Sequence, residues 1–126
     1  MAQRLGNVAV GTVLKLNENG SPQNYIVVHQ GLPSSMYDNS CNGTWLLRQN
    51  IYTTSIWDRD NNGFPYDYIT YELEDLFSAY DLNIQSVIKT VKIPYCVGNN
   101  SSQVNSGANG YSCQLFLLSG PELGCL

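Results

Sequence analysis

Asp58, Asp60 and Asn62 lie in the segment IWDRDNNGFPYDY with the D-x-D-x-N-G spacing that opens a calcium-binding loop. A complete loop of this type places a bidentate glutamate six residues after the glycine, where this chain has Ile69. Pro65 also removes a backbone N–H that such a loop uses. We therefore expect no metal site and interpret the segment as an Asx-rich turn. Asp58, Asp60 and Asn62 remain candidates only for an atypical metal site.

Catalytic side chains are sparse. The single histidine, His29, could in principle activate the thiol of Cys41 or Cys113, but no sequence feature brings either cysteine to it. Glu72 and Asp75 share a helical spacing, and we interpret them as part of a solvated helix face. The segment SGANG lacks the lysine and the helix of a phosphate-binding loop. We predict a protein that is not an enzyme and that needs no cofactor.

Aromatic and small polar residues are abundant instead. The chain has nine tyrosines and two tryptophans among many Asn, Ser and Gly residues. Tyr and Trp provide rigid amphipathic contact area, and Ser, Gly and Asn provide adaptable hydrogen bonds, a mixture typical of recognition surfaces. It also suits carbohydrate, because aromatic rings stack on sugar faces. The candidate ligand-binding residues are Trp45, Trp57, Tyr111 and Asn109.

The charge pattern limits the partners. Charged residues make up 13% of the chain, about half the usual share, and the formal net charge is −4. No cluster of Lys and Arg is present, which argues against nucleic acid and against an anionic membrane surface. The N-terminal segment MAQRLGNVAVGTVLKL has no long apolar stretch, so we expect neither a signal peptide nor membrane insertion.

The length of 126 residues predicts a single domain over 1–126 with a core of its own. The four cysteines, Cys41, Cys96, Cys113 and Cys125, include no C-x-x-C pair, which argues against structural zinc. The sequence does not choose among their three possible disulfide pairings, or between disulfides and buried thiols.

Hydrophobic periodicity predicts an α+β fold with a small mixed β-sheet and two short helices. The helix after the Asp58 loop carries its apolar residues at Ile69, Leu73, Leu76, Phe77 and Tyr80, with Asp67 as the N-cap. A second helix is predicted over residues 82–91. Strands are predicted at residues 8–16, 25–31 and 44–52, with a hairpin loop at 17–24 between the first two. The sequence further predicts an extended segment at 91–95, a long loop at 96–112 and a central buried strand at 113–120.

Several segments together resemble a family of phage and prophage proteins from Gram-positive gut bacteria, classed as a domain of unknown function. In chain order they are LGNVAVGTVLKL, YIVVHQG, CNGTWLLRQNIY, WDRDNN, VIKTVKIPY, SGANGYSCQLFLLSG and PELG. The resemblance covers nearly all of the chain and implies a C-type-lectin-like fold, similar to that of formylglycine-generating enzymes. Members of that family continue with a second half, so it also implies a partial domain that lacks the usual C-terminal half.

The same resemblance implies a tail-associated structural or receptor-binding protein in the virion, made in the host cytoplasm and extracellular after lysis. The expected partners are a host-surface glycan, a larger tail protein, or further copies of the chain in a homo-oligomer. An apolar strand at 116–119 that seeks a partner favours the oligomer. Two alternatives stay open: a stand-alone carbohydrate-binding module, and a phage-encoded inhibitor of a host protein.

Overall fold

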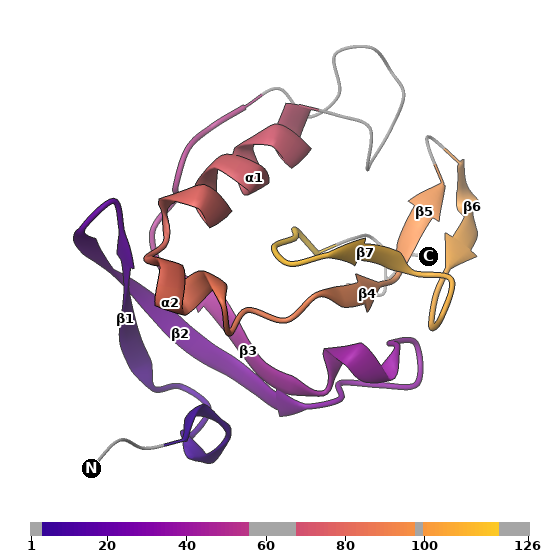
Figure 1. Cartoon of the computed structure of the whole chain (residues 1–126). Coiled ribbons are helices and arrows are strands. Elements are labelled where there is room, and N and C mark those ends of the chain that lie inside the picture. Colours follow the sequence, from indigo (N-terminus) through magenta and orange to yellow (C-terminus); the bar gives the residue numbers. More distant parts are fainter. Residues whose placement is uncertain (1–3, 56–67, 98–99, 119–126) are drawn as a thin grey trace.

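A computed structural model describes residues 4–55, 68–97 and 100–118 (Figure 1). Within these ranges, the chain forms seven strands, two α-helices and two short 3-10 helices. The strands are β1 (Val13–Glu18), β2 (Ser21–Gly31), β3 (Gly43–Arg48), β4 (Val91–Ile93), β5 (Tyr95–Val97), β6 (Asn100–Asn105) and β7 (Tyr111–Cys113). The helices are η1 (Leu5–Asn7), η2 (Asn39–Cys41), α1 (Tyr68–Ala79) and α2 (Leu82–Gln85).

The β1–β2 hairpin turns more tightly than the sequence suggested. Asn19 and Gly20 have φ angles of 52° and 80°, and the neighbouring residues Glu18 and Ser21 are already paired. Two left-handed residues between antiparallel strands form the hairpin turn for which an Asn-Gly pair is the strongest sequence signal. The predicted loop over 17–24 is therefore wrong, because the other turn-forming residues of that segment join the strands.

β1, β2 and β3 form an antiparallel sheet in that order. Tyr25 pairs with Leu14 on one side and with Arg48 on the other, so these three side chains share a face. The next row, Val13, Ile26 and Leu47, lies on the opposite face. This second face stays accessible: Val13 is 50% and Leu47 is 57% exposed.

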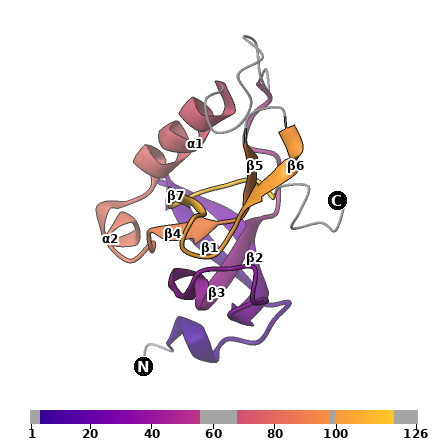
Figure 2. The ribbon, with the colours of Figure 1, turned by 90° about the vertical axis from the view of Figure 1, so that its right-hand side faces the viewer.

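Both helices lie on one side of the β1–β3 sheet (Figures 1 and 2). This side carries Tyr25, because Phe77 of α1 and Ile84 of α2 belong to the same core cluster. The core centres on Tyr25, Leu76 and Tyr80. Partly buried apolar side chains surround it, namely Leu14, Leu16, Leu46, Phe77, Ile84, Ile88 and Leu115. The predicted apolar stripe of α1 is confirmed for Leu76, Phe77 and Tyr80, which pack in this core. Ile69 and Leu73, nearer the start of the helix, are half-buried.

α2 is shorter than the predicted helix over 82–91. It ends at Gln85, and the chain is extended again from Val91. Residues 87–91 include three β-branched side chains besides Val91, and such residues favour extended backbone. Ile84 and Ile88 still pack on the core, whereas Val87, which has the same apolar spacing, is 73% exposed. The periodicity therefore predicted burial for part of this segment and overestimated the length of the helix.

β4 pairs with β7, and this pairing depends on a glycine. A Cβ atom at Gly110 would lie 2.6 Å from the carbonyl oxygen of Ile93, which is fully buried. Any larger residue would push β4 and the approach to β7 apart. Gly110 thus fixes how closely the segment before β7 lies against β4.

Two predictions for the last third of the described chain are wrong. The predicted loop over 96–112 contains most of the β5–β6 hairpin and the start of β7. The predicted buried strand over 113–120 ends as a strand at Cys113, and Leu117 and Leu118 are 42% and 53% exposed. Within the described ranges, residues 114–118 have no ladder partner, and Leu115 and Phe116 pack as individual side chains.

The described elements confirm an α+β fold. The strands do not form one mixed sheet: they form one three-stranded and two two-stranded sheets, all antiparallel. In Figure 1 the β5–β6 hairpin lies at the far side of the molecule from β1. No helix in the described ranges is long and apolar enough to cross a membrane.

Candidate functional site: a polar cluster and two cavities

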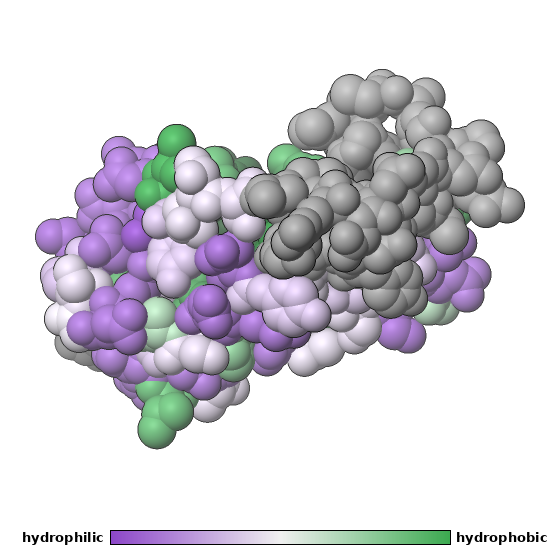
Figure 3. Space-filling view, turned by 90° about the horizontal axis from the view of Figure 1, so that it is seen from above, coloured by the Kyte–Doolittle hydropathy of each residue, from purple (hydrophilic) through white to green (hydrophobic). Residues whose placement is uncertain are grey.

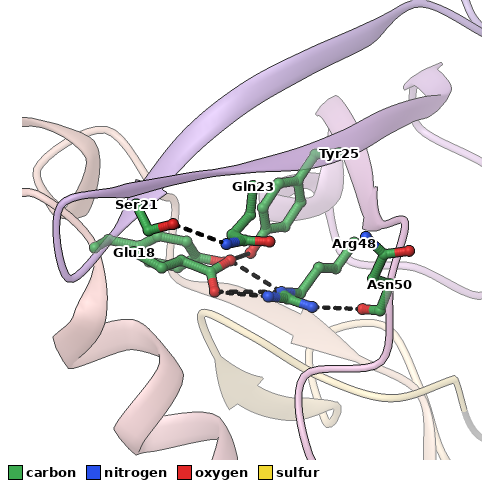
Figure 4. Close-up of polar contacts among 7 residues, drawn as sticks. Glu18, Ser21, Gln23, Tyr25, Arg48 and Asn50 are labelled. Atoms are coloured by element: carbon green, nitrogen blue, oxygen red, sulfur yellow. Dashed lines mark hydrogen bonds and ion pairs between the residues drawn. The ribbon is translucent and has the colours of Figure 1, made fainter.

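A buried polar cluster connects the strand ends of the sheet to Tyr80, the residue after α1. Figure 4 shows its members Glu18, Tyr25 and Arg48. Glu18 ends β1, Arg48 ends β3, Tyr25 lies on β2 between them, and Tyr80 follows α1. The Glu18 carboxylate accepts hydrogen bonds from the Arg48 Nε at 3.0 Å and the Arg48 guanidinium Nη2 at 2.9 Å. Glu18 is only 7% exposed, so this ion pair is nearly removed from water.

The donor and the acceptor can be assigned in each of the two tyrosine hydrogen bonds of the cluster. Tyr25 has one proton, which it donates to Glu18 over 2.5 Å. Tyr80, whose hydroxyl lies 2.6 Å from that of Tyr25, must therefore be the donor in the second bond. Burial, followed by the bond to Glu18, raises the pKa of Tyr25 far above its usual value. Burial is also the main cause of the raised pKa of Tyr80.

We interpret this cluster as structural, because its polar groups bond to one another. The remaining guanidinium nitrogen of Arg48, Nη1, donates to the carbonyl oxygen of Asn50, and the guanidinium carbon lies 5.4 Å from the ring centre of Tyr52. The hydrogen bonds that Arg48 donates to Glu18 raise the pKa of Arg48 further, which keeps the guanidinium charged. All three guanidinium nitrogens of Arg48 thus have partners within the protein, so it has little capacity left for a ligand. The sequence analysis did not predict this cluster, because no local spacing relates its members.

A cleft of about 360 Å³ lies between α1 and the β7 segment. We call it the α1–β7 cleft. Its walls carry hydroxyl, carboxylate, amide and aromatic groups together. The lining residues are Thr70, Leu73, Glu74, Phe77 and Ser78 from α1, and Tyr111, Ser112, Cys113, Gln114 and Leu115 from β7 and the residues after it.

Tyr111, predicted as a ligand-binding residue, lines the α1–β7 cleft. Its ring packs edge-on against Tyr95, with 6.0 Å between ring centres, which holds the ring in one orientation. Glu74 brings a solvent-exposed carboxylate to the opposite wall. Seen from above, the described surface is mainly hydrophilic, with separate hydrophobic groups (Figure 3).

Trp45, the second predicted residue that the structure describes, lies elsewhere. Its indole N–H donates to the carbonyl oxygen of Cys41 at 3.0 Å. Tyr37 and Phe116 pack edge-on against its ring, with ring centres 5.2 Å and 5.4 Å away. Trp45 therefore belongs to an aromatic cluster rather than to the cleft that contains Tyr111.

The other predicted residues are either in a turn or outside the described ranges. Asn109 is exposed in the turn between β6 and β7, where its backbone N–H donates to the carbonyl oxygen of Ser106. Residues that lie outside the described ranges are Trp57, Asp58, Asp60, Asn62, the helix cap Asp67 and Cys125. Of the predicted ligand-binding residues that the structure describes, Tyr111 lines the α1–β7 cleft, and Trp45 and Asn109 do not.

Metal-binding side chains do not cluster in the part of the chain that the structure describes: no three His, Cys, Asp or Glu residues come together there. Cys41 is buried, and its thiol donates to the carbonyl oxygen of Lys92 at 3.2 Å. Cys96 and Cys113 are half-buried on β5 and β7.

A second cavity, of about 250 Å³, lies between the β1–β3 sheet and α2. We call it the sheet–α2 cavity. Its walls are mainly apolar, and Trp45 and Phe116 contribute to them. Lys89 is the charged residue in its lining. The sequence analysis missed this cavity, since its walls come from six separate parts of the chain.

Comparison with known proteins gave one finding. Neither the curated proteins nor the solved structures yielded a match. Residues 35–125 match the family described as a domain of unknown function, DUF6273. That match is narrower than the resemblance inferred from the sequence, because it leaves out β1 and β2. Since it spans more than half of the chain, the protein belongs to the DUF6273 family.

Proposed function

We propose that this protein is a non-enzymatic receptor-binding domain that recognises a host-surface glycan in the α1–β7 cleft. The observation that carries the proposal is the position of Tyr111 in a cleft whose walls combine aromatic rings with hydroxyl and carboxylate groups. A sugar presents hydroxyl groups at its edge and C–H groups on its face, so it needs both kinds of wall.

The hydrogen-bonding groups of the cleft suit a neutral glycan. Glu74 can accept two hydroxyl protons, the Gln114 amide can donate and accept, and Ser78 and Ser112 offer hydroxyls that rotate to suit their partner. Phe77 and Tyr111 supply the aromatic walls. The volume of about 360 Å³ falls within the range of small-molecule sites in proteins.

The acid–base content of the cleft favours binding over cleavage. Glycoside hydrolysis ordinarily uses a pair of carboxylates on either side of the scissile bond. Among the described residues that line the cleft, Glu74 is the one with a carboxylate. A single exposed carboxylate can orient a sugar but does not form such a pair.

The biological setting follows from the sequence resemblance. We propose that the protein is associated with a phage tail, has a C-type-lectin-like architecture, and acts at the host surface after lysis. The low content of charged residues is consistent with recognition through hydrogen bonds and ring contacts. The same cleft would serve a stand-alone carbohydrate-binding module, so the source of the protein does not alter the chemistry proposed.

A glycan array tests the proposal. The wild-type chain should bind a set of bacterial surface glycans, and Tyr111→Ala should abolish that binding. Tyr71→Ala is the matched control, because Tyr71 is 66% exposed on α1 and does not line the cleft. Binding that survives in the Tyr111 variant would place the ligand elsewhere, and no binding to any glycan would remove the proposal.

A second candidate function is self-association into a structural oligomer of the tail. The row formed by Val13, Ile26 and Leu47 on the exposed face of the sheet favours it. Adjacent apolar side chains on an accessible sheet face can be buried against another sheet. This row replaces the predicted strand at 116–119 as the surface for assembly. Light scattering over a range of concentrations tests this candidate.

A further inference from the structure

The walls of the sheet–α2 cavity suit an apolar molecule. Apolar side chains line it from β1, β3, α2, the segment after α2 and the residues after β7: Leu16, Leu46, Ile84, Ile88, Leu115 and Phe116. An engineered cavity of about 150 Å³ holds a benzene molecule. At about 250 Å³, this cavity has room for a body of roughly ten carbon atoms.

The polar side chains in the walls already have protein partners. The Thr44 hydroxyl donates to the Gln30 side-chain oxygen at 2.8 Å, and the Cys41 thiol donates to a carbonyl oxygen. Tyr25 and Tyr80 are engaged in the polar cluster with Glu18. The interior therefore offers few polar groups to a ligand, which favours an aliphatic or aromatic body.

Lys89 is different, because it brings a charge to this apolar cavity. It is the charged member of the lining, and it is exposed, so it lies at the mouth. Its Nζ donates to the carbonyl oxygen of Asn42 at 2.8 Å. A Cβ atom built on Gly43, the first residue of β3, would lie 3.8 Å from the same Nζ. The ammonium group therefore lies close to the start of β3. An ammonium has three N–H donors, and the Asn42 bond uses one.

We propose that the sheet–α2 cavity binds a small monocarboxylate with an aliphatic or aromatic body of about ten carbon atoms, whose carboxylate pairs with Lys89. The apolar walls take the body, and the lone cation at the mouth sets the orientation. This site shares only Gln114 and Leu115 with the α1–β7 cleft, and it does not depend on glycan recognition.

Isothermal titration calorimetry with octanoate and with octan-1-ol tests the proposal on the full chain. Octanoate is expected to bind more tightly than octan-1-ol. The two probes have the same number of carbon atoms, and only octanoate carries a negative charge that can pair with Lys89. Lys89→Glu should weaken octanoate binding about fivefold or more and leave octan-1-ol binding nearly unchanged. Lys15→Glu, an equal change of charge on exposed β1, is the control and should leave both affinities unchanged.

Val87→Trp tests the cavity itself. Val87 lines the cavity and is 73% exposed, so a larger side chain there can obstruct the mouth without entering the core. Binding of both probes should weaken about tenfold or more, because the side chain obstructs their entry. If this variant does not fold, the comparison of Lys89→Glu with Lys15→Glu tests the proposal by itself. Equal octanoate affinity in Lys89→Glu and wild type, or no binding of either probe at millimolar concentration, would overturn the proposal.

Discussion

Glu18 at the end of β1 and Arg48 at the end of β3 form an ion pair of 2.9 Å across the intervening strand β2. Tyr25 on that strand donates to the same carboxylate, and Tyr80 extends the chain of hydrogen bonds to α1. One nearly buried carboxylate therefore ties all three strands of the sheet to the helix that forms one wall of the α1–β7 cleft. We therefore expect loss of this cluster to loosen the packing of α1 on the sheet.

The ion pair should be costly to break from one side. Arg48→Met leaves the Glu18 charge buried without its counterion, and we expect the free energy of unfolding to fall by about 3–5 kcal/mol. The double variant Glu18→Leu, Arg48→Met should recover part of that loss, because neither charge remains. Urea denaturation followed by circular dichroism measures both. A double variant as unstable as the sum of the two single variants would contradict coupling between these residues.

Alkaline pH should weaken the fold through Tyr25. Because burial and the Glu18 bond raise its pKa in the folded state, the unfolded chain loses the phenol proton first. This contribution to stability is complete below about pH 10, the ordinary tyrosine value, and decreases as the pH rises from there towards the folded-state value. Thermal unfolding between pH 8 and 11 should show a steeper loss for wild type than for Tyr25→Phe. Parallel curves would contradict the assignment.

Gly110→Ala should destabilise the β4–β7 pairing, since the added Cβ would lie 2.6 Å from the Ile93 carbonyl oxygen. Overpacking of this kind typically costs about 1–3 kcal/mol. Gly6→Ala is the control, because its Cβ would meet nothing within 4 Å. Chemical denaturation of the two variants compares them directly, and equal stability would show that β4 and β7 can move apart freely.

The exposed apolar row gives a prediction about assembly. If the second candidate function holds, wild type forms an oligomer at high concentration, and Leu47→Asp keeps it monomeric by placing a charge in the buried contact. Val104→Asp is the control, because Val104 is 40% exposed on β6, outside the β1–β3 sheet. Static light scattering reports the mass of each. A wild-type chain that stays monomeric throughout would rule out this assembly.

Local signals in the sequence predicted part of the local structure. The apolar spacing of α1 correctly gave the helix and its buried face, because an amphipathic period is a property of the helix alone. The apolar residues after Cys113 led to a wrong prediction. Their composition is typical of a buried strand, but a strand also needs a hydrogen-bonded partner strand, which composition does not reveal. The Asn19–Gly20 turn was present in the sequence and was read too broadly.

The candidate sites depend on contacts between distant segments. Tyr111 was predicted as a binding residue from its type, but its position across the cleft from Glu74 depends on the packing of β7 against α1. Trp45 has the same aromatic character but is held among other rings. The partners Glu18 and Arg48 are 30 residues apart. Residue type therefore indicated which side chains could contact a ligand. Only the tertiary structure distinguished a side chain that lines the α1–β7 cleft from one that packs among other aromatic rings.

The most direct test of glycan recognition is a calorimetric titration of the full chain with the glycan that gives the strongest array signal. Glu74→Gln should weaken binding about tenfold, because a hydrogen bond to a charged group typically contributes about 1.5–3 kcal/mol. Asp75→Asn, the same change at the neighbouring exposed position outside the cleft lining, should bind as wild type does. If Glu74→Gln and wild type bind equally, or if Asp75→Asn loses the same affinity, the glycan does not occupy the α1–β7 cleft.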